Sequence, residues 1–372
     1  MTIKPFNWIF VLGMMAGLCC SAQDNSTYRG LFTEVKFNYG FILPHHESMR
    51  YLQRGHISSY QVRIGRTTSG KHNWESLYRF PSWGLGYYYT DLQYPKVLGN
   101  VHAVFSFIDI PVTTLKSFTF VYKFAFGLSY ITKPFDPLNN YYNIAIGSHE
   151  NVYLNLCLGN SVNLSDKCDL TCELSLTHYS NGSIAKPNLG INVVSCGLGL
   201  RLYPQGKSEQ ISFTDSTFKP INELVLIAST GWKRISPAIT KNYLTSSISA
   251  GFERSLNRKK KAGVGFDLFY DASITRCMDL ENAVNINPSD NYRPGIHVMY
   301  DMIFGDVAFT IQWGYYIFVK WNTDGSFYHR FGLKYYFSDH FLANLTIKTH
   351  FARADFIEWG IGYHINLKDR SN

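Results

Sequence analysis

Polar and apolar residues alternate with a period of two along much of the chain. The segments 307–315, 341–348 and 357–366 show the alternation most clearly, and it recurs around 60–66 and 264–271. Successive side chains of an extended strand point to opposite faces, so this pattern predicts strands with one apolar and one polar face. Repeated segments of about ten residues of this kind are typical of a transmembrane β-barrel, whose outer wall meets lipid.

Clusters of Gly, Asn, Asp, Pro and Ser separate these segments and mark turns. The spacing predicts about 14 to 16 antiparallel strands. No helical pattern is long enough to make a second domain, so we predict an all-β protein in which a single outer-membrane barrel occupies residues 23–372. A soluble β-sandwich is the alternative, but it would less readily carry aromatic residues at so many strand ends.

The direction of each strand follows from the rule that such barrels begin and end in the periplasm. Counting back from the last strand predicts periplasmic turns at 305–306 and 338–339 and an external segment at 275–293. The strand that ends at Ser180 then points outward. The same count places 204–218 in the periplasm, where its length is unexpected for a turn.

Composition supports a barrel over a bundle of membrane-spanning helices. The 372 residues include 26 Tyr and 27 Phe, charged residues make up only 17%, and mean hydropathy is −0.12. Beyond the N-terminus, no apolar stretch approaches the length of a spanning helix. The net charge of +8 comes without a nucleic-acid-binding motif, which favours anionic lipid headgroups as the partner. We expect the basic cluster at 258–261 to be a solvated turn.

The N-terminus reads as a secretory signal peptide over residues 1–22, with Lys4 before the apolar run 8–18 and cleavage after Ala22. Lipidation at Cys19 or Cys20 is a weaker alternative, because Leu18 is a poor residue at such a site. Five cysteines would remain after cleavage, and their odd number and irregular spacing do not form a disulfide framework. The cysteines left are Cys157, Cys168, Cys172, Cys196 and Cys277. We expect Cys172 and Cys196 to act as small outward-facing apolar residues, while one bridge involving Cys168 stays open.

Candidate catalytic residues are concentrated in the segment 178–192. His178 and Ser180 share one strand face and continue an apolar stripe that includes Leu174 and Leu176. Asn192 begins the apolar stripe of the next strand. All three are therefore predicted on the lipid-facing side near the outer rim, where a membrane lipid could reach them without entering the barrel.

These three residue types can form a nucleophile, a base and an orienting group. A serine hydroxyl attacks only when a base takes its proton, and a third group must fix the tautomer of that base. The negative oxygen that forms during acyl transfer also needs hydrogen-bond donors. The candidates are the backbone N–H groups of Gly182 and Ser183 and the side-chain amides of Asn181 and Asn188.

The non-catalytic alternative is that these residues simply form a polar rim and turn, where Ser, Asn and Gly are common anyway. The pair His45–His46 is only weak evidence for a metal site.

The pattern His-x-Ser-Asn at 178–181, followed by Pro-Asn-x-Gly at 187–190, resembles the lipid A 3-O-deacylase (PagL) family, also called acyloxyacyl hydrolases. The resemblance implies that Ser180 is the nucleophile, His178 the base and Asn188 an oxyanion donor for hydrolysis of an ester-linked acyl chain of lipid A. It also implies a bacterial outer-membrane enzyme without a cofactor. The family typically has a glutamate where this chain has Asn192, and its typical barrel has eight strands.

A Ser-His-Asn set is similar instead to outer membrane phospholipase A, which would imply calcium as cofactor and phospholipid as substrate. No clear acidic calcium site lies near Ser180 in the sequence, and the 186–190 turn favours the deacylase. Glu173, the nearest carboxylate, is predicted on the water-facing lumen side. A porin-like or structural barrel is the non-enzymatic alternative, because lumen residues such as Arg63, Arg66, Asp267, Lys348 and Glu358 would suit a channel. A homodimer is left open as a further partner.

Overall fold

The computed structural model describes residues 28–212, 217–351 and 353–367, so the predicted signal peptide lies outside the described residues. The described chain is built of antiparallel strands with a few short helices. The first eight strands are β1 (Leu31–Ile42), β2 (His56–Thr67), β3 (Ser82–Asp91), β4 (Asn100–Leu115), β5 (Phe118–Ile131), β6 (Glu150–Ser165), β7 (Cys168–Ser180) and β8 (Ile191–Leu202). The next eight are β9 (Asn222–Lys233), β10 (Tyr243–Asn257), β11 (Lys260–Asp271), β12 (Tyr292–Phe304), β13 (Val307–Tyr316), β14 (Phe327–Tyr336), β15 (Phe341–His350) and β16 (Arg353–Leu367).

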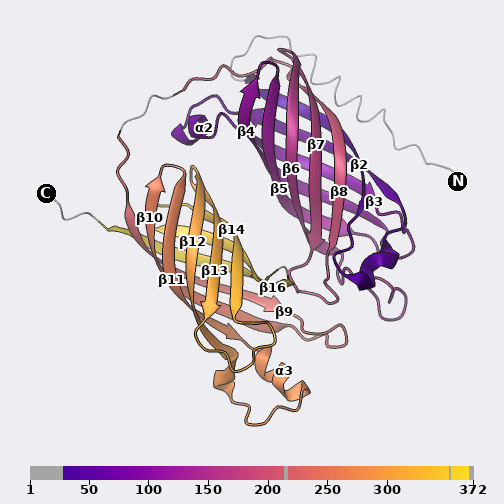
Figure 1. Cartoon of the computed structure of the whole chain (residues 1–372), viewed down its shortest axis with the longest axis vertical. Coiled ribbons are helices and arrows are strands. Elements are labelled where there is room, and N and C mark those ends of the chain that lie inside the picture. Colours follow the sequence, from indigo (N-terminus) through magenta and orange to yellow (C-terminus); the bar gives the residue numbers. More distant parts are fainter. Residues whose placement is uncertain (1–27, 213–216, 352, 368–372) are drawn as a thin grey trace.

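The strands close into two barrels, which lie side by side in Figure 1. In the first, β8 returns to pair with β1, with Val35 opposite Leu200. In the second, β16 pairs with β9, with Ile361 opposite Ala228. The all-β class and the predicted strand number are confirmed, but the prediction of one barrel is wrong. Alternation identifies the faces of a strand and leaves open which strand closes the sheet.

The segment between the barrels explains the excess length noted at 204–218. It is the linker from the end of β8 to the start of β9, rather than a long turn within one barrel. Part of it packs back on the first barrel, because Gly30 N–H donates to the carbonyl of Gly206 and Ile211 N–H to that of Ser69.

Each barrel has a loop end and a turn end. Short turns such as 305–306 and 337–340 lie at one end of the second barrel, and 272–291, with α3 (Ile274–Leu280) and η3 (Pro288–Asn291), lies at the other. We call the end with 272–291, and in the first barrel the end with 181–190, the loop end. The two loop ends lie at the same side of the molecule, toward the bottom of Figure 1. The first barrel carries η2 (Glu47–Leu52) at its loop end and α2 (Asn73–Leu77) at its turn end. None of the helices in the described ranges is long and apolar enough to cross a membrane.

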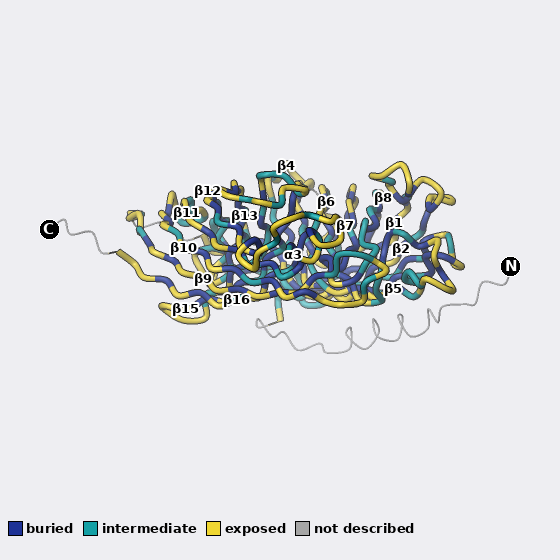
Figure 2. The backbone as a smooth tube through the Cα atoms, turned by 90° about the horizontal axis from the view of Figure 1, so that it is seen from below, coloured by how far each residue is buried: buried dark blue, intermediate teal, exposed yellow. Residues whose placement is uncertain are grey.

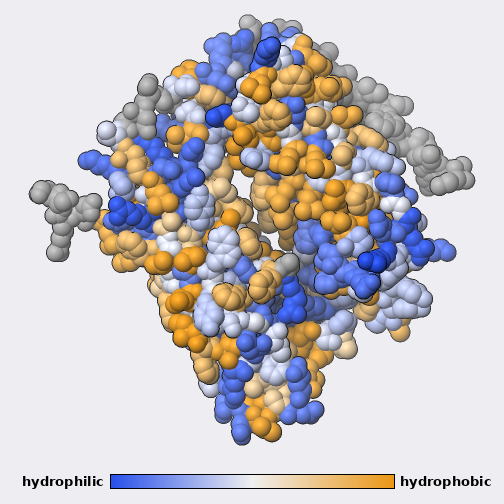
Figure 3. Space-filling model, viewed as in Figure 1, coloured by the Kyte–Doolittle hydropathy of each residue, from blue (hydrophilic) through white to orange (hydrophobic). Residues whose placement is uncertain are grey.

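Burial alternates along the strands, as Figure 2 shows. In β7 the odd-numbered residues from Asp169 to Tyr179 are buried, while Leu170, Cys172, Leu174 and Leu176 are exposed. Figure 3 shows apolar residues gathered over the visible wall of the first barrel. The five cysteines named above are free, and Cys172 and Cys196 are exposed on the outer wall as expected.

Charged side chains fill the interior of the first barrel. Glu34 and Asp109 each accept from both Arg63 and Arg201, over 2.5 to 3.0 Å. Glu173 accepts from two lysines, Lys36 at 2.6 Å and Lys123 at 2.8 Å. The prediction that Glu173 faces the lumen is right, and its partners there are these two ammonium groups. An eight-stranded barrel is just wide enough for its side chains to meet across the interior.

The second barrel has a similar interior. Arg330 lies 2.8 Å from both Asp267 and Glu358, and Lys334 bridges Glu253 and Asp301. A cavity lined by Lys36, Arg63 and Lys123 in the first barrel has a volume of only about 10 Å³, at the lower limit for one water. Arg63, Asp267, Lys348 and Glu358, which the sequence left compatible with a channel, are all in such ion pairs. The prediction for Arg66 is wrong, because it alternates with Arg63 and lies on the opposite face of β2.

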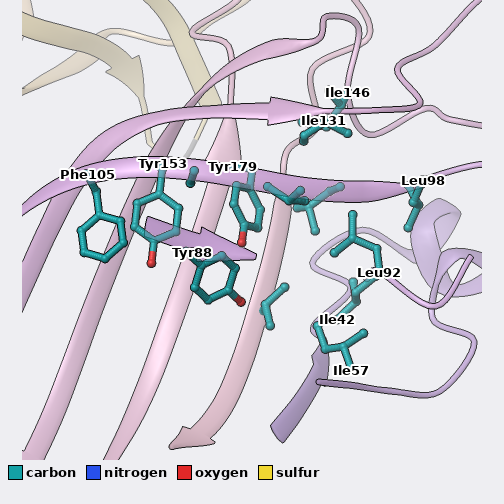
Figure 4. Packing of buried hydrophobic residues seen from close by; sticks show 14 of the residues in the cluster. Ile42, Ile57, Tyr88, Leu92, Leu98, Phe105, Ile131, Ile146, Tyr153 and Tyr179 are labelled. Carbon is teal, nitrogen blue, oxygen red and sulfur yellow. The ribbon is translucent and has the colours of Figure 1, made fainter. Parts of the chain in front are cut away.

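An apolar cluster occupies the loop end of the first barrel. Tyr153 stacks on Phe105 there and also contacts Tyr88 and Tyr179, as Figure 4 shows, and Tyr179 is fully buried. Tyr179 points inward, so the residues on either side of it in β7 are directed to the outer face.

Candidate active site

His178 and Asn192 are direct partners across the β7–β8 pair. His178 Nδ1 lies 2.6 Å from Asn192 Oδ1. The antiparallel pairing alone brings these side chains together, because directly opposite residues share one face. The period-two alternation already placed both residues on one face of consecutive strands.

Ser180 lies two residues beyond His178 on the same side of β7, at the strand end. It is 7% exposed, and His178 is also largely covered. Within the described residues no hydrogen bond joins Ser180 to His178. Catalytic hydrogen bonds are often long before substrate binds, and the i, i+2 spacing directs both side chains to the same face of β7.

His45, from the loop after β1, continues the contact beyond Asn192. Its Nδ1 lies 3.0 Å from Asn192 Nδ2, and its Nε2 lies 2.8 Å from the carbonyl oxygen of Leu189. In the sequence, His45 stood out only as part of a histidine pair that is weak evidence for a metal site. Its contact with Asn192 depends on the β1–β8 closure, which the one-barrel prediction lacks.

The predicted oxyanion donors lie in the loop 181–190, and they differ in what they contact. The Asn181 side-chain amide donates to Ser148 Oγ at 2.8 Å, and its backbone N–H donates to Asn188 Oδ1 at 3.0 Å. Asn188 therefore has its oxygen engaged, while in the described structure its Nδ2 has no recorded acceptor. Gly182 and Ser183 also have backbone N–H groups without a recorded acceptor among the described residues. Asn181 orders the loop, which leaves Asn188, Gly182 and Ser183 as available donors.

Gly190 packs directly against the candidate base. Its φ is +83°, a region that favours glycine. A Cβ at this position would lie 2.7 Å from His178 Cε1 and 3.4 Å from Nε2. The last residue of the Pro-Asn-x-Gly motif thus lets the loop approach the edge of the imidazole.

The second barrel contacts the same loop. Ser183 Oγ donates to the Ala354 carbonyl at 2.8 Å, and Arg234 N–H donates to the Ser183 carbonyl at 2.8 Å. At the turn end, Tyr78 stacks on Phe304, and Lys259 Nζ donates to the Leu77 carbonyl. Lys259 belongs to the basic cluster expected to be a solvated turn, so that expectation holds only in part. The sequence carried no signal for contacts between barrels.

A polar cavity of about 170 Å³ opens between loop 181–190 and the loop end of the second barrel. Lys186, Arg234, Arg293 and Arg353 line it together with Asp324 and Asp355. Lys186 donates to Ser183 Oγ at 3.1 Å, and no carboxylate is recorded within ion-pair distance of it in the described chain. Burial, and next the Lys233 ammonium, lower the pKa of Lys186.

No group of three or more His, Cys, Asp or Glu side chains lies close enough to hold a metal within the described ranges. The calcium that the phospholipase alternative would bring needs several oxygen ligands, carboxylates among them. Glu173, the carboxylate nearest to the site in the sequence, is held inside the barrel by Lys36 and Lys123.

Comparison with protein families matches each barrel separately. Residues 58–201 match the model described as lipid A 3-O-deacylase (PagL), and residues 222–367 match the acyloxyacyl hydrolase C-terminal domain. The chain belongs to the lipid A 3-O-deacylase (PagL) family. The predicted family is confirmed, and the chain is an outer-membrane hydrolase of the PagL family. The chain has sixteen strands where the family typically has eight, because the PagL model matches the first, eight-stranded barrel alone.

Solved structures of other outer-membrane proteins are similar in part. The outer membrane enzyme PagL is 16% identical with a TM-score of 0.30, and the match covers 45% of this chain and 97% of that one. Neisserial surface protein A is 9% identical with a TM-score of 0.34, covering 47% and 97%. A Rhodopseudomonas blastica porin is 9% identical with a TM-score of 0.18, covering 90% and 99%. A search of curated proteins found no match.

Proposed function

We propose that this protein is a serine esterase that removes an ester-linked acyl chain from lipid A on the outer face of its first barrel. Ser180 is the nucleophile, His178 the general base and Asn192 the group that orients His178. The observation that carries the proposal is the 2.6 Å contact between His178 Nδ1 and Asn192 Oδ1, on the same strand face as Ser180.

The reaction proceeds by acyl transfer. His178 Nε2 takes the proton of the Ser180 hydroxyl as its oxygen attacks the ester carbonyl, and the resulting imidazolium returns that proton to the leaving sugar oxygen. Water then hydrolyses the acyl-enzyme by the same route. The negative oxygen of each tetrahedral intermediate accepts from Asn188 Nδ2 and from the N–H of Gly182 or Ser183.

The position of the site suits a membrane lipid. Leu174 and Leu176 lead to it along the outer wall, so an acyl chain can stay in the hydrocarbon layer. Lys186 and Arg234 line the polar cavity on the other side of the loop, where they can attract the phosphates of lipid A. The external leaflet is therefore the proposed location of the substrate.

Outer membrane phospholipase activity is the second candidate, because Asn192 rather than a carboxylate contacts His178. The two functions are separated by offering purified protein lipid A or phosphatidylethanolamine in detergent micelles and measuring released fatty acid. We expect release from lipid A by the wild type, and a loss of at least about 10³-fold in Ser180→Ala.

Ser106→Ala is the matched control, since Ser106 is exposed on the outer wall at β4 and should leave the rate unchanged. Release from phosphatidylethanolamine alone would favour the phospholipase. Equal release by Ser180→Ala and wild type would refute the assigned nucleophile.

A further inference from the structure

Three side chains form a continuous row of contacts that ends at the candidate base. The Leu189 carbonyl lies 2.8 Å from His45 Nε2, and His45 Nδ1 lies 3.0 Å from Asn192 Nδ2. Asn192 Oδ1 in turn lies 2.6 Å from His178 Nδ1. The row joins a loop backbone group to His178 through two polar side chains.

The Leu189 carbonyl, at the start of this row, fixes the direction of every hydrogen bond in it. A backbone carbonyl can only accept, so His45 Nε2 must carry the proton it donates to Leu189. Neutral His45 then has a lone pair on Nδ1, which accepts from the Asn192 amide nitrogen. The Asn192 oxygen is thereby directed to His178 and accepts from Nδ1–H.

His178, at the end of the row, is left in the tautomer that catalysis requires. With its proton on Nδ1, neutral His178 has its lone pair on Nε2, where it can take the hydroxyl proton of Ser180. If Asn192 were reversed, its NH₂ group would donate to His178 Nδ1. The His178 proton would then sit on Nε2, and the base would be lost.

We propose that His45 is a positioning residue that selects the productive orientation of the Asn192 amide and, through it, the productive tautomer of His178. This inference rests on the proposed function of His178 and Ser180, and it adds a role for a residue outside the candidate triad. His45 acts without touching the reacting atoms.

An asparagine in the third position creates the need for such a residue. A carboxylate accepts a proton from His178 through either oxygen, so its rotation by half a turn changes nothing. An amide has one accepting and one donating end, and only one orientation serves. His45 supplies the preference that a carboxylate would not need.

The surroundings of His45 fit positioning rather than metal binding or core packing. The residue is exposed, so it does not fill the interior. Both ring nitrogens face the partners named above, and the Nδ1 lone pair that a metal would take is directed at the Asn192 amide. His46, whose ring centroid is 4.8 Å from that of His45, contacts neither Asn192 nor Leu189 among the recorded hydrogen bonds of the described chain.

The test is a double-mutant cycle on the purified full chain, with acyl release from lipid A in detergent micelles as the readout. In the wild-type background, His45→Ala should lower kcat about 3- to 10-fold, the effect of losing one orienting hydrogen bond, with KM little changed. His46→Ala is the matched control and should keep wild-type kcat. In the Asn192→Asp background, His45→Ala should change kcat by less than about twofold, because the carboxylate has no wrong orientation.

Each result bears on the inference. Wild-type kcat in His45→Ala would overturn it, and so would an equal loss in both backgrounds, which would indicate a general structural role. An inactive Asn192→Asp beside an active wild type also contradicts it, since a carboxylate offers His178 the same acceptor. If the wild type releases no acyl chain from lipid A, the proposed function fails and this inference fails with it.

Discussion

Gly182 of the first barrel lies against Ile357 of the second. A Cβ on Gly182 would come 2.4 Å from Ile357 Cγ1, and the φ of Gly182 is +61°. The loop that begins directly after Ser180 therefore packs on the second barrel, which supports the position of the proposed oxyanion donors.

This contact predicts that Gly182→Ala lowers kcat. The methyl group must displace either Ile357 or the loop, and the left-handed backbone adds about 1 kcal/mol of strain. We expect a fall of about 10-fold or more in acyl release, since losing one oxyanion donor costs about 10²–10³-fold. Adding Ile357→Ala should restore part of the rate by opening space. If the double variant is no faster than Gly182→Ala, the contact between the barrels does not position the loop.

Gly190 provides a second steric test, this time at His178. Gly190→Ala places a methyl group 2.7 Å from His178 Cε1 and should displace the imidazole. Gly206→Ala is the matched control, because its φ of +77° brings similar backbone strain while nothing lies within 4 Å of its Cβ. Both variants should lose about 1 kcal/mol of stability, but only Gly190→Ala should lose most of its acyl release. Equal rates in the two variants would contradict close packing of the loop on His178.

The strand alternation predicted the faces of β7 and β8 well. Placing His178, Ser180 and Asn192 on one side required only the period of two, and the pairing of two consecutive strands brought His178 to Asn192. The partner of β8 on its other edge was not predictable in this way. That edge pairs with β1, more than 150 residues earlier, and a wrong closure leaves His45 far from Asn192.

The ion pairs inside the barrel could not be predicted from the sequence pattern either. Alternation correctly placed Glu173 inside, but its lysine partners come from β1 and β5. Such cross-barrel pairs depend on the diameter of the barrel and on its register. One barrel of sixteen strands would have held these groups apart.

Asn192→Ala should lower kcat about 10- to 100-fold with little change in KM. The substitution removes the acceptor of His178 Nδ1–H, and general base catalysis typically contributes about 10²–10⁴-fold. Single-substrate kinetics on lipid A micelles give both parameters. Wild-type turnover in Asn192→Ala would show that His178 needs no orienting partner.

Lys186→Met should have opposite effects on substrate binding and on stability. Loss of a cation beside the site should raise KM for lipid A about 2- to 5-fold, the value of a weak charge contact. Because burial and Lys233 lower the pKa of Lys186 below 10.5, the charged form destabilises the folded state at neutral pH. The variant should therefore unfold at a higher temperature at pH 7, and this gain should disappear as the pH rises toward 10.5. An unchanged KM would exclude Lys186 from substrate binding.

The lipid A of cells that produce the wild type or Ser180→Ala tests the proposed activity most directly. Mass spectrometry should show loss of one ester-linked acyl chain with the wild type and intact lipid A with Ser180→Ala, at equal levels of folded protein. Identical lipid A in the two strains, whether intact or deacylated, would contradict a deacylase that uses Ser180.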